Sequence, residues 1–443
     1  MKPVMKLGLF FLWALFFNNA RAFARIHDVP IVLVAKKIPI LQFYQVNSYR
    51  VFKSDENGNA IPIPFQIDQK DRYDDFSLDE GKAPNRVNKP FAGNDELSLM
   101  GKDIGIKKVP KKWGGRKPDF LYEVVFRRNI IENGKSEMKE AAIYVGIYRQ
   151  NPPPLSNESY VKFDIKQEEV LTKKYRYLFN TKNYLVVRGV NIEEPGNIEQ
   201  KIIMSSAVYM KLDMKYFLTL NLGHSDIESN LDAYKVGPIR VIARVNFDYK
   251  ILKMKFDLGM YTEVSFFSNS VNLPAIIDNP LDGKKSLNKG SYFYYGLALV
   301  DNPKDLTPKS NMPDFKNKSG YWKSPEKKAP GDNYWAFAQS PSYTLYLEFL
   351  PSTQMEKDGN VPNLYVEHVD QSVLKTRKTG PLPLGESPVN VAVTFALDNF
   401  ARGLHQIRFR VYIENEKAEG ILEEFKDIDK WGTQVSPIRM QDF

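Results

Sequence analysis

The chain of 443 residues contains no cysteine, and this absence removes several kinds of chemistry at once. Disulfides, thiolate catalysis and cysteine-based zinc sites are excluded, as is lipid attachment through a cysteine. A chain of this length can bury enough apolar surface to fold without such supports. We therefore expect the hydrophobic core to carry the stability of the protein.

Histidine is also scarce, with four in the chain, and no two have the spacing of a metal-binding pair. We expect neither a metal nor a cofactor. The absence of a Gly-x-Ser-x-Gly motif leaves a serine hydrolase without support. His224, with Asp226 two residues further on, is a candidate general base or binding residue in a loop, and His368 lies in a similar setting. Solvated turn residues are the alternative interpretation for both.

Long hydrophobic runs are missing as well, and the longest, from Leu7 to Phe17, has eleven residues. Crossing a bilayer as a helix takes about 20 apolar residues, so this run is too short. Lysines precede it and small residues follow it, which is the pattern of a secretory signal peptide over residues 1–22. We expect cleavage after Ala22, or after Ala24, and no transmembrane segment in what remains. The sequence thus predicts an exported protein, periplasmic or extracellular, with a retained membrane anchor as the alternative.

Neither sign of charge dominates strongly. Lys2, Lys6 and Arg21 lie in the predicted signal peptide, so +6 remains of the formal net charge of +9. Acidic and basic residues are interspersed and no nucleic-acid recognition motif is present, so nucleic acid is not an expected partner. The densest basic cluster, between Lys107 and Lys117, is either a solvated loop or a contact for an anionic envelope polymer.

Aromatic residues and proline are abundant, with 24 tyrosines, 28 phenylalanines and 28 prolines. This composition favours pleated strands separated by turns over long helices. Short stretches of alternating apolar residues, bounded by Gly, Pro, Asn or Asp, predict an all-β fold of sandwich type. They are found at residues 49–51, 61–67, 121–126, 143–147, 184–187, 239–245, 343–349, 389–395 and 407–413.

Three consecutive prolines, Pro152 to Pro154, favour a stiff, extended backbone that cannot join a central strand. They predict a boundary between an N-terminal β domain, residues 23–150, and a larger β-sandwich, residues 151–443. One short amphipathic helix is expected at residues 416–430. The polar, lysine-rich stretch 301–332 is predicted to be a long functional or mobile loop.

The segment from Asp55 to Asn59 separates two alternating stretches, and its Asn57-Gly58 dipeptide is typical of a type I′ hairpin. The spacing of Asp55, Asn57 and Asn59 also resembles that of a calcium loop. Such a loop needs a later glycine and a bidentate glutamate, which are absent. The hairpin is the preferred interpretation.

Three carboxylates stand in the most motif-like part of the chain, Asp68 in "IPFQIDQKD" and Asp95 and Glu96 in "AGNDELSLMGKDIG". They could converge for acid–base work or bind a cation, or they could bond to backbone amides in turns. These segments resemble the N-terminal module of uncharacterised exported bacterial β-proteins. The segment "VGPIRVIARV" at 236–245 is similar to a strand of the β-supersandwich (galactose-mutarotase-like) domains found in some polysaccharide lyases. The resemblance implies a large β-sandwich; no lyase catalytic residue can be matched here.

Aromatic residues flank the lysine-rich stretch, and they suggest a platform for sugar rings, which stack on flat aromatic faces. Tyr321 and Trp322 lie within the polar stretch itself, while Trp335 follows it in an alternating segment where packing in a β core is the alternative. We predict an exported protein that binds carbohydrate or envelope polysaccharide without catalysis. The alternatives are a carbohydrate-active enzyme, either a lyase or a hydrolase, and a structural component of the cell envelope. The candidate binding residues are Tyr321, Trp322, Trp335, His224 and Asp226.

Overall fold

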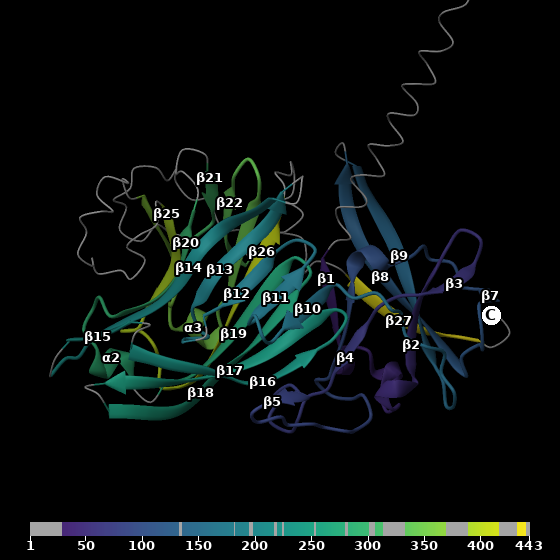
Figure 1. The fold of residues 1–443 in the computed structure, drawn as a ribbon, viewed down its shortest axis with the longest axis horizontal. Coiled ribbons are helices and arrows are strands. Elements are labelled where there is room, and N and C mark those ends of the chain that lie inside the picture. The colour runs from purple at the N-terminus through teal and green to yellow at the C-terminus, as the bar shows by residue number, and fades with distance from the viewer. Residues whose placement is uncertain are drawn as a thin grey trace, which may run out of the picture. The chain divides into compact units, whose positions relative to one another are not determined.

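A computed structural model describes residues 29–439, apart from 133–134, 181, 195–197, 217–218, 224–225, 252–253, 280–281, 301–305, 313–332, 369–388 and 416–431. The described residues are mostly in strands, which confirms the all-β prediction (Figure 1). The helices among them, α2 (Gly283–Ser286) and α3 (Thr353–Lys357), are short. None of the described helices is long and apolar enough to cross a membrane. The predicted signal peptide and the helix expected at 416–430 lie outside the described residues.

The chain forms two compact units. Unit 1 comprises Met1–Ser77, Arg86–Ser159 and Asp427–Phe443, and unit 2 comprises Leu78–Asn85 and Tyr160–Lys426. The chain passes from unit 1 to unit 2 shortly after the three prolines. It also crosses at residues 78–85 and again near the C-terminus, so the units interleave in sequence where a single division at residue 150 was predicted.

Unit 1 contains a small and a larger sheet. Its core is formed by apolar side chains from both, among them Leu33, Tyr49, Leu97 and Val124. The three-stranded sheet has the order β1 (Pro30–Val34), β6 (Glu96–Met100) and β4 (Gln66–Asp68). The six-stranded sheet has the order β27 (Gly432–Ile438), β8 (Phe120–Glu132), β9 (Lys135–Ile147), β2 (Tyr49–Ser54), β3 (Asn59–Pro62) and β7 (Lys112–Trp113).

Strands β2 and β3 form the predicted hairpin, but the turn is not of type I′. That type needs positive φ at both central residues, and only Gly58, at φ 74°, has it. Asp55 accepts hydrogen bonds at Oδ1 from the amides of Asn57 (2.9 Å) and Asn59 (2.8 Å). The Asn59 side chain also donates to Asp55 and lowers the pKa of this carboxyl below its ordinary value. The side chains of Asp55 and Asn59, which have the spacing of a calcium loop, therefore close the turn instead.

Unit 2 is a sandwich of two large sheets. Aromatic side chains fill its interior: Phe266 lies 4.8 Å from Tyr177 between ring centroids, and Phe409 lies 5.2 Å from Tyr295. The first sheet has the order β10 (Val161–Asp164), β11 (Glu169–Thr172), β12 (Arg176–Phe179), β13 (Val187–Glu194), β14 (Ile198–Asp213), β20 (Tyr292–Leu299), β25 (Val389–Ala396) and β24 (Asn363–His368), with β15 (Thr219–Gly223) also paired to β14.

The second sheet of unit 2 carries the candidate site described below. Its strands β17 and β18 contain the predicted stretch 239–245 and its hairpin partner. The sheet has the order β21 (Thr307–Ser310), β22 (Tyr334–Gln339), β23 (Thr344–Leu350), β26 (Gly403–Glu414), β19 (Ser270–Asn279), β18 (Met254–Phe267), β17 (Arg240–Ile251), β16 (Ile227–Val236) and β5 (Glu80–Gly81).

Candidate functional site

One line of polar side chains crosses the second sheet of unit 2 perpendicular to its strands. Ser265 on β18 pairs with Asn272 on β19, and Asn272 pairs with Arg410 on β26. Arg410 pairs in turn with Glu348 on β23, which pairs with Trp335 on β22. Directly paired residues point to the same face of a sheet, so these five side chains form one row. We call them the polar row.

The polar row lies on the face of the sheet that points away from the sandwich interior. Successive side chains of a strand alternate between faces. Phe266, the neighbour of Ser265, contacts Phe179 of the first sheet at 5.4 Å between ring centroids. Phe349, the neighbour of Glu348, contacts Phe395 of that sheet at 6.1 Å. The apolar set therefore faces the first sheet and the polar row faces the other way, where Ser265, Glu348 and Trp335 are buried and Asn272 and Arg410 are partly exposed.

Two arginine–glutamate ion pairs stabilise this outer face. Arg410 Nη1 lies 3.2 Å from Glu348 Oε2, while the Asn333 amide donates to Glu348 Oε1 at 2.6 Å. The second pair lies on the same face, two residues along β18 from Ser265. There Arg244 donates to Glu263 Oε1 through both Nε (3.1 Å) and Nη2 (2.6 Å). Both glutamates are buried. Buried charges are costly unless they are paired and hydrogen-bonded, and here both conditions are met.

Asn272, in the middle of the polar row, has an unsatisfied acceptor. Its Oδ1 is buried and has no hydrogen-bond partner among the residues that the structure describes. Buried carbonyl oxygens without a donor are uncommon in folded proteins and cost free energy. Asn272 as a residue is only partly buried, so a hydroxyl group that reached its side-chain oxygen would supply the missing donor. Several other described side chains have such an atom, and Asn272 is the one at the centre of the polar row.

Aromatic rings line one side of the polar row. Trp335 stacks on Tyr346 at 6.2 Å between centroids and 22° between planes, and Tyr346 contacts Tyr412 at 6.0 Å. Trp335 is only 3% exposed, so this ring does not form the exposed platform that the sequence suggested. Its ring packs against Tyr346 of β23, and β22 is an interior strand of the sheet, between β21 and β23. Trp335 instead belongs to the packed border of the row.

The remaining candidate residues are placed as follows. Tyr321, Trp322 and His224 lie outside the described residues, so their predicted roles stay predictions. Asp226 accepts a hydrogen bond at Oδ2 from the amide of Gly223 (2.8 Å). This contact joins Asp226 to the last residue of β15, a backbone contact of the kind that Asx side chains commonly make.

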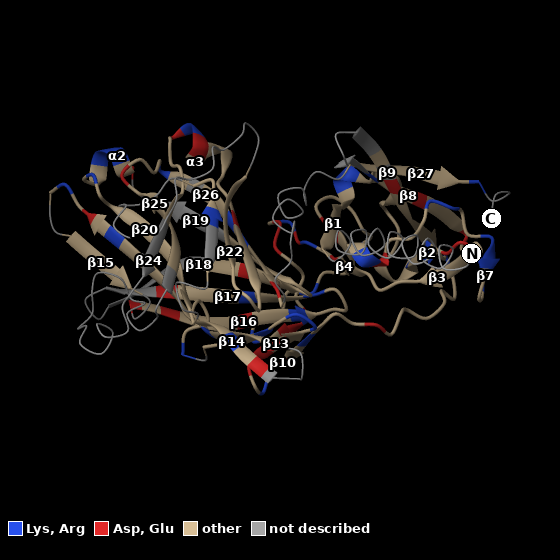
Figure 2. Cartoon of the chain, turned by 90° about the horizontal axis from the view of Figure 1, so that it is seen from above, with Lys and Arg blue, Asp and Glu red and all other residues tan. Residues whose placement is uncertain are grey.

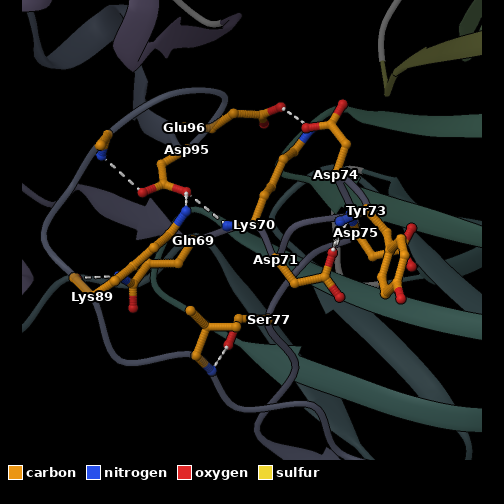
Figure 3. A network of polar contacts seen from close by, with 12 residues as sticks. Gln69, Lys70, Asp71, Tyr73, Asp74, Asp75, Ser77, Lys89, Asp95 and Glu96 are labelled. Atoms are coloured by element: carbon orange, nitrogen blue, oxygen red, sulfur yellow. Dashed lines mark hydrogen bonds and ion pairs between the residues drawn. The ribbon is translucent and has the colours of Figure 1, made fainter.

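The carboxylates near the N-terminus form a second polar network, in unit 1 (Figure 3). Asp95 is completely buried and accepts hydrogen bonds from the amides of Lys70 (2.8 Å) and Ala92 (2.9 Å). Its Oδ1 also lies 3.0 Å from Lys89 Nζ. All of these partners hold the segments around residues 70 and 90 together, and the turn interpretation of Asp95 is therefore confirmed.

The other two carboxylates, those of Glu96 and Asp68, also have partners within the protein. Glu96 lies 3.1 Å from Lys70 Nζ, and Asp68 accepts two hydrogen bonds from Gln66 Nε2, at 2.9 and 3.1 Å. Asp68 and Glu96 are paired across β4 and β6, so the side chains do come together. Each is bound to a cation or an amide, which is the pattern of a structural network.

Charge elsewhere is dispersed over both units (Figure 2). In the basic cluster, Lys107 pairs with Glu140 at 2.7 Å, and Arg127 pairs with the same glutamate at 2.6 Å. These contacts hold the pKa of Glu140 below its ordinary value. Among the described residues, no group of three or more His, Asp or Glu side chains could hold a metal ion.

Comparisons with known proteins identify no family for this chain. No family model and no curated protein matches the chain. Among solved structures, an alpha-mannosidase from Enterococcus faecalis V583 is similar over 92% of this chain, at 7% identity and a TM-score of 0.43. A glycosyl hydrolase family 38 protein from Enterococcus faecalis shows 8% identity and a TM-score of 0.41. The chain covers 44% and 45% of these proteins, less than half of their length. TM-scores at this level do not establish a shared fold, so neither activity is carried over.

Proposed function

We propose that this chain is an exported β-sandwich protein that binds carbohydrate on the outer face of the second sheet of unit 2. The observation that carries the proposal is the unsatisfied Oδ1 of Asn272 between ion-paired Arg410 and the hydroxyl of Ser265. Sugar hydroxyls both donate and accept hydrogen bonds, and a row of amide, guanidinium and carboxylate groups offers partners for both. The predicted signal peptide supports export.

Binding without catalysis fits the state of the carboxylates. A general acid must present a proton to the reacting oxygen of the substrate. Glu348 and Glu263 are instead each paired with an arginine, and Glu348 also accepts from Asn333. Carboxylates held by arginine in this way can accept hydrogen bonds from sugar hydroxyls and so orient the sugar. The network therefore favours recognition over bond cleavage.

The test is an Asn272→Leu variant in a glycan array and on an affinity column of the best glycan. Leucine removes the amide at the centre of the row with a similar volume, so we expect at least about tenfold weaker binding with unchanged or raised thermal stability. Asn360→Leu is the matched control, because the Asn360 side chain is also buried and neither of its amide atoms has a hydrogen-bond partner in the described part of the chain. Equal retention of Asn272→Leu and the unmodified protein would contradict the proposal. Release of shortened sugars would favour the enzyme instead.

A further inference from the structure

A short segment of unit 1, Lys36–Phe43, presents apolar and basic side chains to solvent. It contains two 3₁₀ turns, Ala35–Lys37 and Pro39–Leu41. In a 3₁₀ helix, residues three apart lie on one side. Ala35, Ile38 and Leu41 accordingly all face the core of unit 1. The positions between them are left on the outside.

The outward positions combine hydrophobic and positive groups. Phe43 is 76% exposed and Ile40 is 40% exposed. Lys36 and Lys37 are exposed beside them. The sequence has no Asp or Glu from Val29 to Ser54, so these lysines face no carboxylate from their own stretch of chain.

Phe43 is held in an unfavourable backbone conformation. Its φ is 73°, in the left-handed region where a bulky side chain is a genuine outlier. The residue after a helical turn that adopts this conformation is usually glycine. Phe43 gains no packing in return, because its ring points to solvent. A strained residue with an exposed ring is reason to look for a role outside the fold.

The segment is also rigidly attached to unit 1. The amide of Phe43 donates to the carbonyl of Phe91 (2.9 Å), and Gln42 Nε2 donates to the carbonyl of Ala35 (2.8 Å). At the start of the segment, the amide of Lys36 donates to the carbonyl of Gly93 (2.8 Å). The exposed ring is therefore preorganised and needs little ordering on binding.

We propose that Lys36–Phe43 docks unit 1 on an anionic lipid surface, with Phe43 and Ile40 entering the headgroup region and the two lysines contacting lipid phosphates. Aromatic and aliphatic side chains beside lysines are the composition of interfacial membrane anchors. A protein partner fits less well, because lysine is depleted in protein interfaces and a standard interface buries about 800 Å² per partner. The proposal is independent of carbohydrate binding by unit 2.

The test is co-sedimentation of the protein with vesicles of phosphatidylglycerol and phosphatidylcholine, against vesicles of phosphatidylcholine alone. We expect binding only to the anionic vesicles, weakened by salt. Phe43→Gly should lower the vesicle affinity at least about tenfold. It should keep or raise the melting temperature, because glycine adopts this φ without strain. The combined change Lys36→Glu and Lys37→Glu should lower the affinity by about 30-fold or more, since each lysine near an anionic surface contributes about fivefold.

Matched controls come from unit 2. Tyr216→Ser removes an aromatic ring that is 82% exposed, and Lys284→Glu with Lys285→Glu reverses another adjacent lysine pair. Both should leave vesicle binding unchanged. Binding of Phe43→Gly at the level of the unmodified protein would overturn the proposal, as would equal binding to both kinds of vesicle. If Phe43→Gly instead abolished self-association in sedimentation equilibrium without changing vesicle binding, the segment would be assigned to a second copy of the chain.

Discussion

At the scale of single residues, the chain places several charged groups where water cannot reach them. Asp95 is the clearest case, since it has no exposed surface and three groups bind its carboxylate. Two of the three are backbone amides, which position the chain, and the third is the lysine that balances the charge. Such a group is costly to bury and still more costly to disturb.

Asp95→Ala should therefore lower the free energy of unfolding by about 3 kcal/mol or more. The change leaves the buried amides of Lys70 and Ala92 without acceptors and Lys89 without its counter-charge. Urea denaturation of the two proteins measures the difference. Glu56→Ala, at an exposed position in the β2–β3 turn, should change it by less than about 0.5 kcal/mol. A loss below 1 kcal/mol for Asp95→Ala would mean that the network is not needed for stability.

The sequence predicted single residues well only where their contacts are local. The turn at Asp95 and the hairpin around Asn57-Gly58 rest on contacts within a few positions, although Asp95 also binds the distant amide of Lys70. Asn272 could not be found in this way, because its row joins strands from residue 265 to residue 410. Trp335 was singled out for its ring, but that ring packs against Tyr346 of the neighbouring strand β23, a contact that the sequence does not reveal.

At the scale of elements, the excursion Leu78–Asn85 stands out. It leaves unit 1, adds β5 to the edge of β16 in unit 2 and returns. The amides of Lys82 (2.6 Å) and Ala83 (3.1 Å) both donate to the carbonyl of Asp232, and Tyr234 donates to the Glu80 carboxylate at 2.8 Å. An added strand of this kind covers an edge that could otherwise pair with another chain.

Gly81 is the residue on which this pairing depends. Its φ is 110°, and a Cβ there would lie 2.6 Å from both Ala233 Cα and the Asp232 carbonyl oxygen. Gly81→Ala should detach β5, lower stability by more than about 1 kcal/mol, and speed hydrogen exchange at the amides of Lys82 and Ala83. Gly114→Ala is the control, because a Cβ at Gly114 meets nothing within 4 Å. Unchanged exchange in Gly81→Ala would show that the backbone tolerates the added group.

Most of the predicted strands are present, because alternation along the chain is a local signal. The stretches at 121–126, 143–147, 239–245 and 343–349 lie in β8, β9, β17 and β23. The long strands β14, β16 and β19 were missed, although apolar residues alternate with outer-face residues in β19 from Ser270 to Ile277. The outer face of β19 also carries Asn272, the residue at the centre of the candidate site.

At the scale of the whole molecule, both units contain large buried aromatic residues in their cores, and the chain has no cysteine to supplement these cores with disulfides. Tyr148 in unit 1 and Tyr177 in unit 2 are both buried. Burial raises the pKa of Tyr148 to about 12, although the nearby Arg50 and Arg116 act to lower it. Burial also raises the pKa of Tyr177 above its ordinary value.

These shifts predict how the protein responds to alkali. An unfolded tyrosine ionises near pH 10, whereas Tyr148 in the folded state ionises near pH 12. Because the folded-state pKa is the higher one, the contribution of Tyr148 is complete below about pH 10 and is lost as pH rises toward 12, by roughly 2–3 kcal/mol in total. Urea denaturation at a series of pH values, followed by tyrosinate absorbance, measures the loss. Tyr148→Phe gives up the hydrogen bond to the Arg116 carbonyl but should show a shallower decline above pH 10. Identical slopes for the two proteins would mean that Tyr148 already ionises near pH 10 in the folded state.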